Sequence, residues 1–184
     1  MMAAATNFWI RWRVRIGYPV AIAYLIFAKP TARSLMIGGM VGVIGLAIRA
    51  WAAGYLRKHE RLAMGGPYAF TRNPLYFGSV ILAAGFVVAG WSIWAGIIVA
   101  AYLTLFYPPV MRREESELDA HYGEDFTQYA ARVPLFWPRF ARRSSAALHE
   151  SFSAELYLRN REYQAVVGFF FGLALLWAEM HWIH

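Results

Sequence analysis

Apolar blocks long enough to cross a bilayer constrain this chain more than any other feature of its sequence. A membrane-spanning helix needs roughly 20 mostly apolar residues, and 59% of this chain is hydrophobic, against about 45–50% in a soluble domain. The blocks cover approximately residues 8–28, 35–56, 74–90, 91–107 and 163–182. The sequence therefore predicts an all-α integral membrane protein, with five transmembrane helices in one domain, 1–184.

The basic residues lie almost entirely on one side of these predicted spans. Three arginines lie at the N-terminal end of the first predicted span, and most of the others lie in the 57–73 connector and the 111–161 segment. Only Lys29 and Arg33 lie in the loop between the first two spans, and Gly90 alone separates the third span from the fourth. The positive-inside rule predicts the N-terminus inside and the C-terminus outside.

Several classes of function are disfavoured by what the sequence lacks. The absence of cysteine removes disulfides, thiolate zinc sites and cysteine nucleophiles. No phosphate-binding loop, dinucleotide fingerprint, zinc-protease motif or nucleophile elbow is present, and the histidines have no metal-ligand spacing. The net charge of +7 suits the anionic headgroups of a cytoplasmic leaflet better than nucleic acid. We therefore expect no metal site and no nucleic-acid partner.

The 111–161 segment is charged but carries helical periodicity. One apolar stripe with the spacing of an amphipathic helix comprises Leu118, Tyr122, Phe126, Tyr129 and Val133. A second stripe, which leads toward the last span, comprises Leu148, Phe152, Leu156 and Tyr157. Pro134 and Pro138 end the first pattern. These cytosolic helices are expected to cap the bundle or to rest on the lipid headgroups.

The first stretch with candidate chemistry is 66–78, GPYAFTRNPLYFG. Pro74 suits the first turn of the third span, and Asn73 before it suits the N-cap. A helix start favours an anionic ligand group, and the Arg72 guanidinium suits a carboxylate. The alternative interpretation is an interfacial loop with Arg72 on a lipid phosphate.

The second stretch is Arg112–Leu118, directly after the fourth predicted span. Glu114 and Glu115 are adjacent, so one is expected to face the bundle and the other Arg112 or solvent. A carboxylate facing the connector would attract an ammonium or sulfonium group, although a solvated run of charges is the alternative. Arg72 and a glutamate held at the same helix ends would form a receptor for a zwitterion, such as the amino-acid end of S-adenosylmethionine.

The motifs of this chain and their order along the sequence resemble those of the isoprenylcysteine carboxyl methyltransferase family. The resemblance rests on Gly66-Pro67-Tyr68, Arg72 to Gly78, Glu114-Glu115 with Leu118, Tyr122-Gly123-Glu124 and Tyr129. Phospholipid N-methyltransferases share the same C-terminal pattern. The similarity covers roughly residues 57–140. The usual histidine before the proline is Asn73 here, which forms hydrogen bonds but does not titrate near neutrality.

The resemblance implies that the cofactor is S-adenosylmethionine, bound without a Rossmann domain by the cytosolic segments 57–73 and 111–161. The cofactor-binding residues that it implies are Leu62, Gly66, Pro67, Tyr68, Arg72, Asn73, Pro74, Tyr76, Glu114 and Glu115. Of these, Arg72 and Glu115 are the candidates for a catalytic role. The implied substrate is lipid-like or isoprenylated, and in a prokaryote the enzyme would lie in the inner membrane with its site facing the cytosol.

The chemistry of the acceptor favours a carboxylate. Methyl transfer from a sulfonium depends mainly on alignment, and a carboxylate needs no base, whereas an ammonium must first lose a proton. Arg49, inside the second predicted span and close to Trp51, is a candidate to bind an acidic group of the substrate. The alternative for Arg49 is snorkelling to the inner interface.

Two other functions stay open from the sequence alone. Sterol reductases carry a similar C-terminal pattern, so an NADPH-dependent membrane reductase is one alternative, and a non-enzymatic membrane scaffold is the other. Gly38, Gly42 and Gly45 line one face of the second span. Such small residues suit helix packing within one chain and between copies equally well, so they do not predict an oligomeric state.

Overall fold

The structure is a computed structural model that describes residues 2–57, 60–139 and 151–182. All secondary-structure elements of the described residues are helices, with no strand among them, which confirms the all-α prediction. In chain order, the elements are α1 (Met2–Phe27), α2 (Ala32–Ala53), η1 (Gly66–Ala69), α3 (Pro74–Gly90), α4 (Ile93–Tyr122), α5 (Glu124–Arg132), α6 (Ala154–Arg159) and α7 (Tyr163–Trp182).

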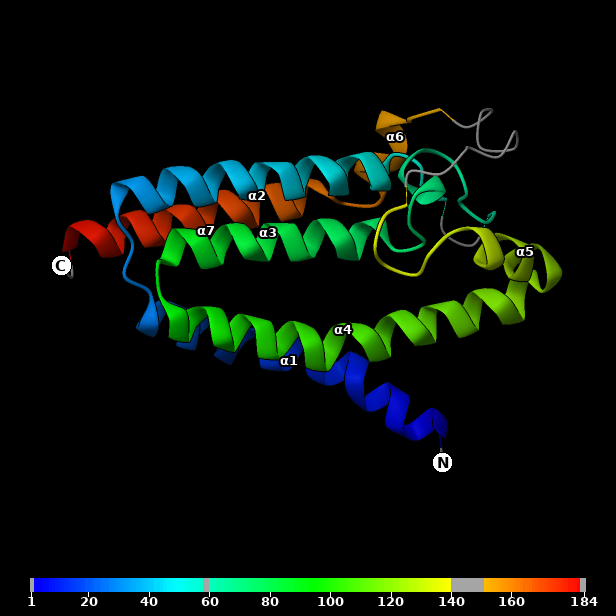
Figure 1. The fold of residues 1–184 in the computed structure, drawn as a ribbon, viewed down its shortest axis with the longest axis horizontal. Coiled ribbons are helices and arrows are strands. Elements are labelled where there is room, and N and C mark those ends of the chain that lie inside the picture. The colour runs from blue at the N-terminus through cyan, green and yellow to red at the C-terminus, as the bar shows by residue number, and fades with distance from the viewer. Residues whose placement is uncertain (1, 58–59, 140–150, 183–184) are drawn as a thin grey trace.

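The long helices form two layers (Figure 1). α2, α3 and α7 run side by side in one layer, and α1 packs against α4 in the other. The connector with η1, together with α5 and α6, gathers at one end of the bundle, and the C-terminus lies at the opposite end. The segments predicted to face the cytosol therefore lie at a common end.

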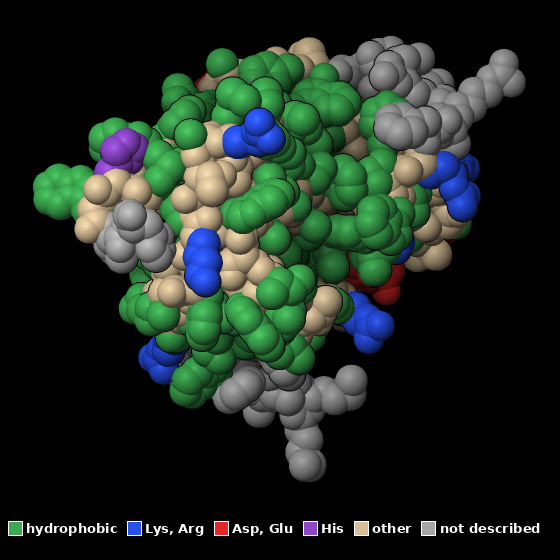
Figure 2. Space-filling model, turned by 60° about the vertical axis from the view of Figure 1, so that its left-hand side comes forward, with side chains coloured by type: hydrophobic (Ala, Val, Ile, Leu, Met, Phe, Trp, Pro, Cys, Tyr) green, Lys and Arg blue, Asp and Glu red, His purple; other side chains and the backbone are tan. Residues whose placement is uncertain are grey.

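Three of the described helices are long and apolar enough to cross a membrane, namely α2, α4 and α7. Two further apolar helical stretches, Arg15–Phe27 within α1 and Pro74–Gly90, are shorter than a typical span. Figure 2 shows a face of the molecule covered largely by hydrophobic side chains. The fold is therefore that of a membrane protein, while the five spans and their orientation stay predictions.

The helix boundaries correct two of the predicted spans. The second span was predicted at 35–56, but α2 begins at Ala32, because Thr31 and Ser34 form a capping box, and ends at Ala53 before Gly54. The fourth was predicted at 91–107, but α4 runs from Ile93 to Tyr122. Trp91, with φ 45°, forms the left-handed turn after Gly90, so the predicted tight hairpin is present.

Two residues with positive φ divide the predicted cytosolic helices. Gly123, with φ 54°, ends α4 and starts α5, so the stripe from Leu118 to Val133 spans two helices rather than one. Arg161, with φ 57°, separates α6 from α7, so the second amphipathic stretch does not run directly into the last span. Leu148 of that stretch lies outside the described residues.

α2 and α3 pack with their backbones in contact. A Cβ atom added at Gly45 would lie 2.5 Å from the backbone nitrogen of Leu82, and one at Gly38 would lie 2.4 Å from the backbone oxygen of Gly85. Only glycine permits such an approach, which gives the dispersion contact on which helix association in lipid depends. The contact holds the C-terminal end of α2 beside the start of α3.

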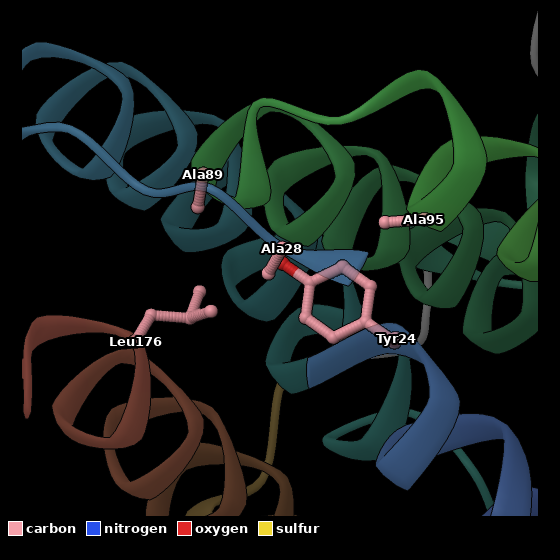
Figure 3. Close-up of a cluster of buried hydrophobic side chains, with 5 residues drawn as sticks. All are labelled: Tyr24, Ala28, Ala89, Ala95 and Leu176. Carbon is pink, nitrogen blue, oxygen red and sulfur yellow. The ribbon is translucent and has the colours of Figure 1, made fainter. Parts of the chain in front are cut away.

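The opposite end of the bundle is held by a small apolar core (Figure 3). Tyr24 of α1 points among Ala28, Ala89 at the end of α3, Ala95 of α4 and Leu176 of α7, all of them buried. The Tyr24 hydroxyl also donates a hydrogen bond to the backbone oxygen of Phe86. This core joins both layers at the end of the bundle far from the connector.

At the connector end, α7 is attached to α2 and α3 by polar contacts. Arg49 donates from Nε to Glu162 Oε2 at 3.0 Å and from Nη2 to Oε1 at 2.8 Å. Its Nη1 donates to Ser79 Oγ on α3. Asn160 Nδ2 donates to the backbone oxygens of Ala53 and Leu56 at 3.0 and 2.9 Å, which satisfies the C-terminal end of α2.

The close packing of α2 on α3 predicts a matched pair of glycine substitutions. Gly45→Ala forces the two backbones apart and is expected to lower the free energy of unfolding by about 1–3 kcal/mol. Gly168→Ala on α7 is the control, because a Cβ there meets nothing within 4 Å. Unfolding by SDS titration in mixed micelles measures both, and equal stability of the two variants would contradict the packing described.

Candidate functional site

A cavity of about 650 Å³ opens at the connector end of the bundle. Its walls come from the end of α2, the connector, the start of α3, the second half of α4 and α5. Ligand sites in proteins typically have volumes of about 300–1,000 Å³. The cavity is therefore large enough for a cofactor-sized molecule.

The start of α3 forms one wall and is fastened to the 134–139 segment. Pro74 occupies the first turn as predicted. Asn73 occupies the N-cap position but forms no capping hydrogen bond, which corrects the predicted role; its Nδ2 donates instead to the backbone oxygen of Leu135 at 3.0 Å. The Thr71 hydroxyl donates to the backbone oxygen of Phe136 at 2.9 Å. Asn73 thus holds two segments together and leaves the first N–H groups of α3 without a side-chain cap.

Arg72 and Glu115 are in direct contact in the lining of the cavity. Arg72 Nη2 lies 2.8 Å from Glu115 Oε1, and both side chains are largely buried. The contact has the distance of an ion pair but not the alignment of a hydrogen bond, since Glu115 Oε1 and Arg72 Nε are both buried without a hydrogen bond in the described part of the chain. Buried polar atoms are usually satisfied, so this pair retains capacity for a ligand.

Tyr76 and Glu114 form a second contact between α3 and α4. The Tyr76 hydroxyl donates to Glu114 Oε1 at 2.7 Å. The Tyr76 ring also packs on Tyr107, with ring centroids 5.2 Å apart. Both glutamates therefore face α3, whereas the sequence predicted that only one would face the bundle. The reason is that Arg72, just before α3, and Tyr76, in its first turn, lie at two different points beside α4.

The wall of the cavity formed by the connector and α5 is apolar and aromatic. Leu62 packs against Phe126 and Tyr129 in a buried cluster. The Tyr129 hydroxyl donates to the backbone oxygen of Tyr68 at 2.8 Å. Burial raises the pKa of Tyr68 far above that of an exposed phenol, and nearby Tyr129 and Glu114 raise it further. Tyr68 therefore stays a neutral phenol at physiological pH.

The structure brings together most of the residues predicted to bind a cofactor. Those that line the cavity are Leu62, Tyr68, Arg72, Asn73, Pro74, Tyr76, Glu114 and Glu115. Gly66 and Pro67 are not among the lining residues and form η1 instead. Gly66 has φ 55°, and a Cβ there would lie 2.7 Å from the ring of Tyr55, so this turn requires glycine.

The two residues predicted to bind substrate separate in the structure. Arg49 lines the end of the cavity nearest the membrane helices, together with Ser79 and Tyr107. Trp51 does not line it and packs on Phe70, with ring centroids 6.2 Å apart. Sequence reasoning missed Glu162, which holds Arg49 from 113 residues away; no local pattern marks such a pair.

The lining carries charges of both signs. Four arginines and three glutamates contribute: Arg49, Arg57, Arg61, Arg72, Glu114, Glu115 and Glu117. Among the described residues, no group of three or more histidine, cysteine, aspartate or glutamate side chains has the arrangement of a metal site. The arrangement suits a ligand that itself carries both charges, such as an amino-acid group.

Comparisons with known proteins found relatives that match most of this chain. The chain is 34% identical over 143 residues to the nickel-cobalt-cadmium resistance protein NccN of Alcaligenes xylosoxydans xylosoxydans, covering 70% of this chain and 67% of that protein. It is 31% identical over 150 residues to the cobalt-zinc-cadmium resistance protein CzcN of Cupriavidus metallidurans, covering 75% and 69%. No solved structure matches the chain at a significant level.

A family model described as phospholipid methyltransferase matches residues 32–125. That range contains α2, α3 and α4, and with them the facing pairs Arg72–Glu115 and Tyr76–Glu114. The matched region is thus the part of the fold that builds most of the cavity. On this match over half of its length, the chain belongs to the phospholipid methyltransferase family.

Proposed function

We propose that this protein is an S-adenosylmethionine-dependent methyltransferase that acts on a lipid-like or isoprenylated acceptor, with a carboxylate favoured as the methylated group. The observation that carries the proposal is the Arg72–Glu115 pair, which lines a cofactor-sized cavity and in which each residue has one buried atom without a hydrogen bond. Family membership supports methyl transfer as the reaction.

The residues present fit the amino-acid end of S-adenosylmethionine. The carboxylate of that group suits Arg72 and the uncapped start of α3, and its ammonium suits Glu115. Inserting a zwitterion between the two would give the buried Arg72 Nε and Glu115 Oε1 the partners that they lack. Bound there, the cofactor would supply a methyl group on a sulfonium, ready for in-line displacement.

The walls of the cavity would assist methyl transfer by holding the reactants in position and by excluding water. Leu62, Phe126 and Tyr129 form a buried apolar cluster, so charges beside them interact more strongly than in water. Tyr76 holds Glu114 toward α3. The chain's contribution to the reaction would then be orientation of two reactants, rather than acid–base chemistry.

The acceptor would enter at the membrane end of the cavity. Arg49, Ser79 and Tyr107 lie there, where a lipid-borne group would arrive from the bilayer. The carboxylate of Glu162 accepts two hydrogen bonds from Arg49, so it is engaged rather than available to take a proton. A carboxylate acceptor, which has no proton to lose, matches that arrangement best.

The two alternatives have weaker support. An NADPH-dependent reductase would lie outside the family that the chain matches, and a scaffold would need no cavity with facing charges. The two relatives are named for resistance to metals. No observation in the described part of this chain favours metal binding as a second function.

We also propose five spans, with the N-terminus and the cavity on the cytosolic side of the membrane. The stretches Arg15–Phe27 and Pro74–Gly90 would be the two shorter spans. Support comes from the charge distribution, since Arg57, Arg61 and Arg72 line the cavity end of the bundle. In a prokaryotic cell this membrane would be the inner one.

Loss of either Arg72 or Glu115 should weaken cofactor binding. Arg72→Ala and Glu115→Ala are each expected to weaken binding of S-adenosylhomocysteine by about ten- to a hundredfold, because each removes a charge-assisted hydrogen bond. Isothermal titration calorimetry of detergent-solubilised protein measures the affinity. Arg159→Ala is the matched control, since Arg159 pairs with Glu60 outside the cavity lining. Unchanged affinity in both cavity variants would contradict the proposal.

The absence of native cysteine makes the orientation testable. Trp182→Cys, at the end of α7, should react with a membrane-impermeant maleimide in intact bacterial spheroplasts. Ala120→Cys, an exposed position near the end of α4, should react only after permeabilisation. Mass shift on a gel reports labelling, and the reversed pattern would show that the cavity faces the other side.

A further inference from the structure

Tyr68 packs in a buried cluster, yet its hydroxyl has no hydrogen-bond partner among the described residues. Its ring packs with Ala52 of α2 and Ala63 in a buried cluster, with Tyr55 and Leu75 against it. The residue is 7% exposed and lines the cavity. In the described part of the chain the hydroxyl forms no hydrogen bond, and its oxygen is not among the fully buried polar atoms. The hydroxyl oxygen is therefore not fully buried, and it belongs to a residue that lines the cavity.

Charged residues from both ends of the cavity act on Tyr68. Besides burial and Tyr129, the carboxylates of Glu114 and Glu162 both act on its ionisation, and Arg49 opposes them. Glu114 belongs to the end that holds Arg72 and Glu115, whereas Glu162 and Arg49 belong to the membrane end. Because Tyr68 lines the same cavity as the charged residues of both ends, it can contact a donor at one end whose methyl group passes to an acceptor at the other.

We propose that the Tyr68 hydroxyl is a catalytic contact that faces the sulfonium and its methyl group, so that the site prefers the charged methyl donor over the neutral thioether product. This inference rests on the proposed function. A neutral phenol oxygen presents lone pairs to a cationic centre and to the polarised C–H bonds of its methyl group. Phenylalanine would keep the ring and remove only that oxygen.

The proposed contact changes during the reaction. A lone pair of the acceptor forms the bond to the methyl carbon, the carbon–sulfur bond breaks, and its electron pair stays on sulfur. The positive charge that Tyr68 faces is then gone, so the contact favours the donor and weakens for the product. By binding the charged methyl donor more tightly than the neutral thioether product, Tyr68 would retain the donor and reduce inhibition by the product.

The test compares ligands that differ in charge at this one point. Affinities of wild type and Tyr68→Phe are measured by calorimetry for S-adenosylmethionine, for S-adenosylhomocysteine and for sinefungin, which carries an amine where the donor carries its sulfonium methyl. Tyr68→Phe is expected to weaken binding of the two cationic ligands by about two- to tenfold, the usual range for one lost hydrogen bond. Affinity for S-adenosylhomocysteine should stay unchanged.

Two controls separate this effect from a change in packing. Tyr55→Phe loses a hydroxyl beside the same cluster but does not line the cavity, so its ratio of affinities should match wild type. The melting temperature of Tyr68→Phe should also match wild type. An equal loss for all three ligands, or no loss for any, would overturn the role of Tyr68. If the wild-type protein bound none of the three ligands, the proposed function itself would be overturned.

Discussion

The contact between the backbones of α2 and α3 is the constraint on which the rest of the structure depends. Because Gly38 and Gly45 have no side chains, α3 lies against α2 along its length. This contact places Arg49 beside Ser79 and the end of α2 beside the start of α3. A lipid environment gives helices little hydrophobic reason to associate, so the glycines, rather than an apolar core, determine where the cavity forms.

Electrostatics then determine what that cavity can hold. Arg72 precedes the start of α3, Glu115 belongs to α4, and the two form an ion pair between these elements. Their buried, incompletely bonded atoms resemble a receptor whose two halves face each other in place of a ligand. Breaking such a pair is costly unless new partners replace both contacts at once. A ligand with one charge would leave one of the two residues unsatisfied, whereas a zwitterion would satisfy both.

Much of this site was predictable from local sequence. The helix start at Pro74 follows from proline chemistry, and the facing charges of Arg72 and Glu115 follow from two short motifs. Other features depend on distant contacts that no periodicity reveals. Asparagine is a residue type that favours the N-cap position, but the side-chain amide of Asn73 forms its hydrogen bond with the backbone oxygen of Leu135 instead. Pro108 and Pro109 lie inside α4, which continues without a break to Tyr122 and ends only at Gly123, where φ is positive.

The Arg49–Glu162 pair has a consequence for how the protein is made. Arg49 enters the membrane early, with α2, but its carboxylate partner lies 113 residues later, next to the last span. An unpaired arginine at membrane depth is costly, so α2 and α3 reach their lowest energy only after α7 arrives. The membrane end of the cavity is therefore completed last during biogenesis. Premature termination before α7 would leave Arg49 without Glu162 at that end, even though the whole family-matched region had been synthesised.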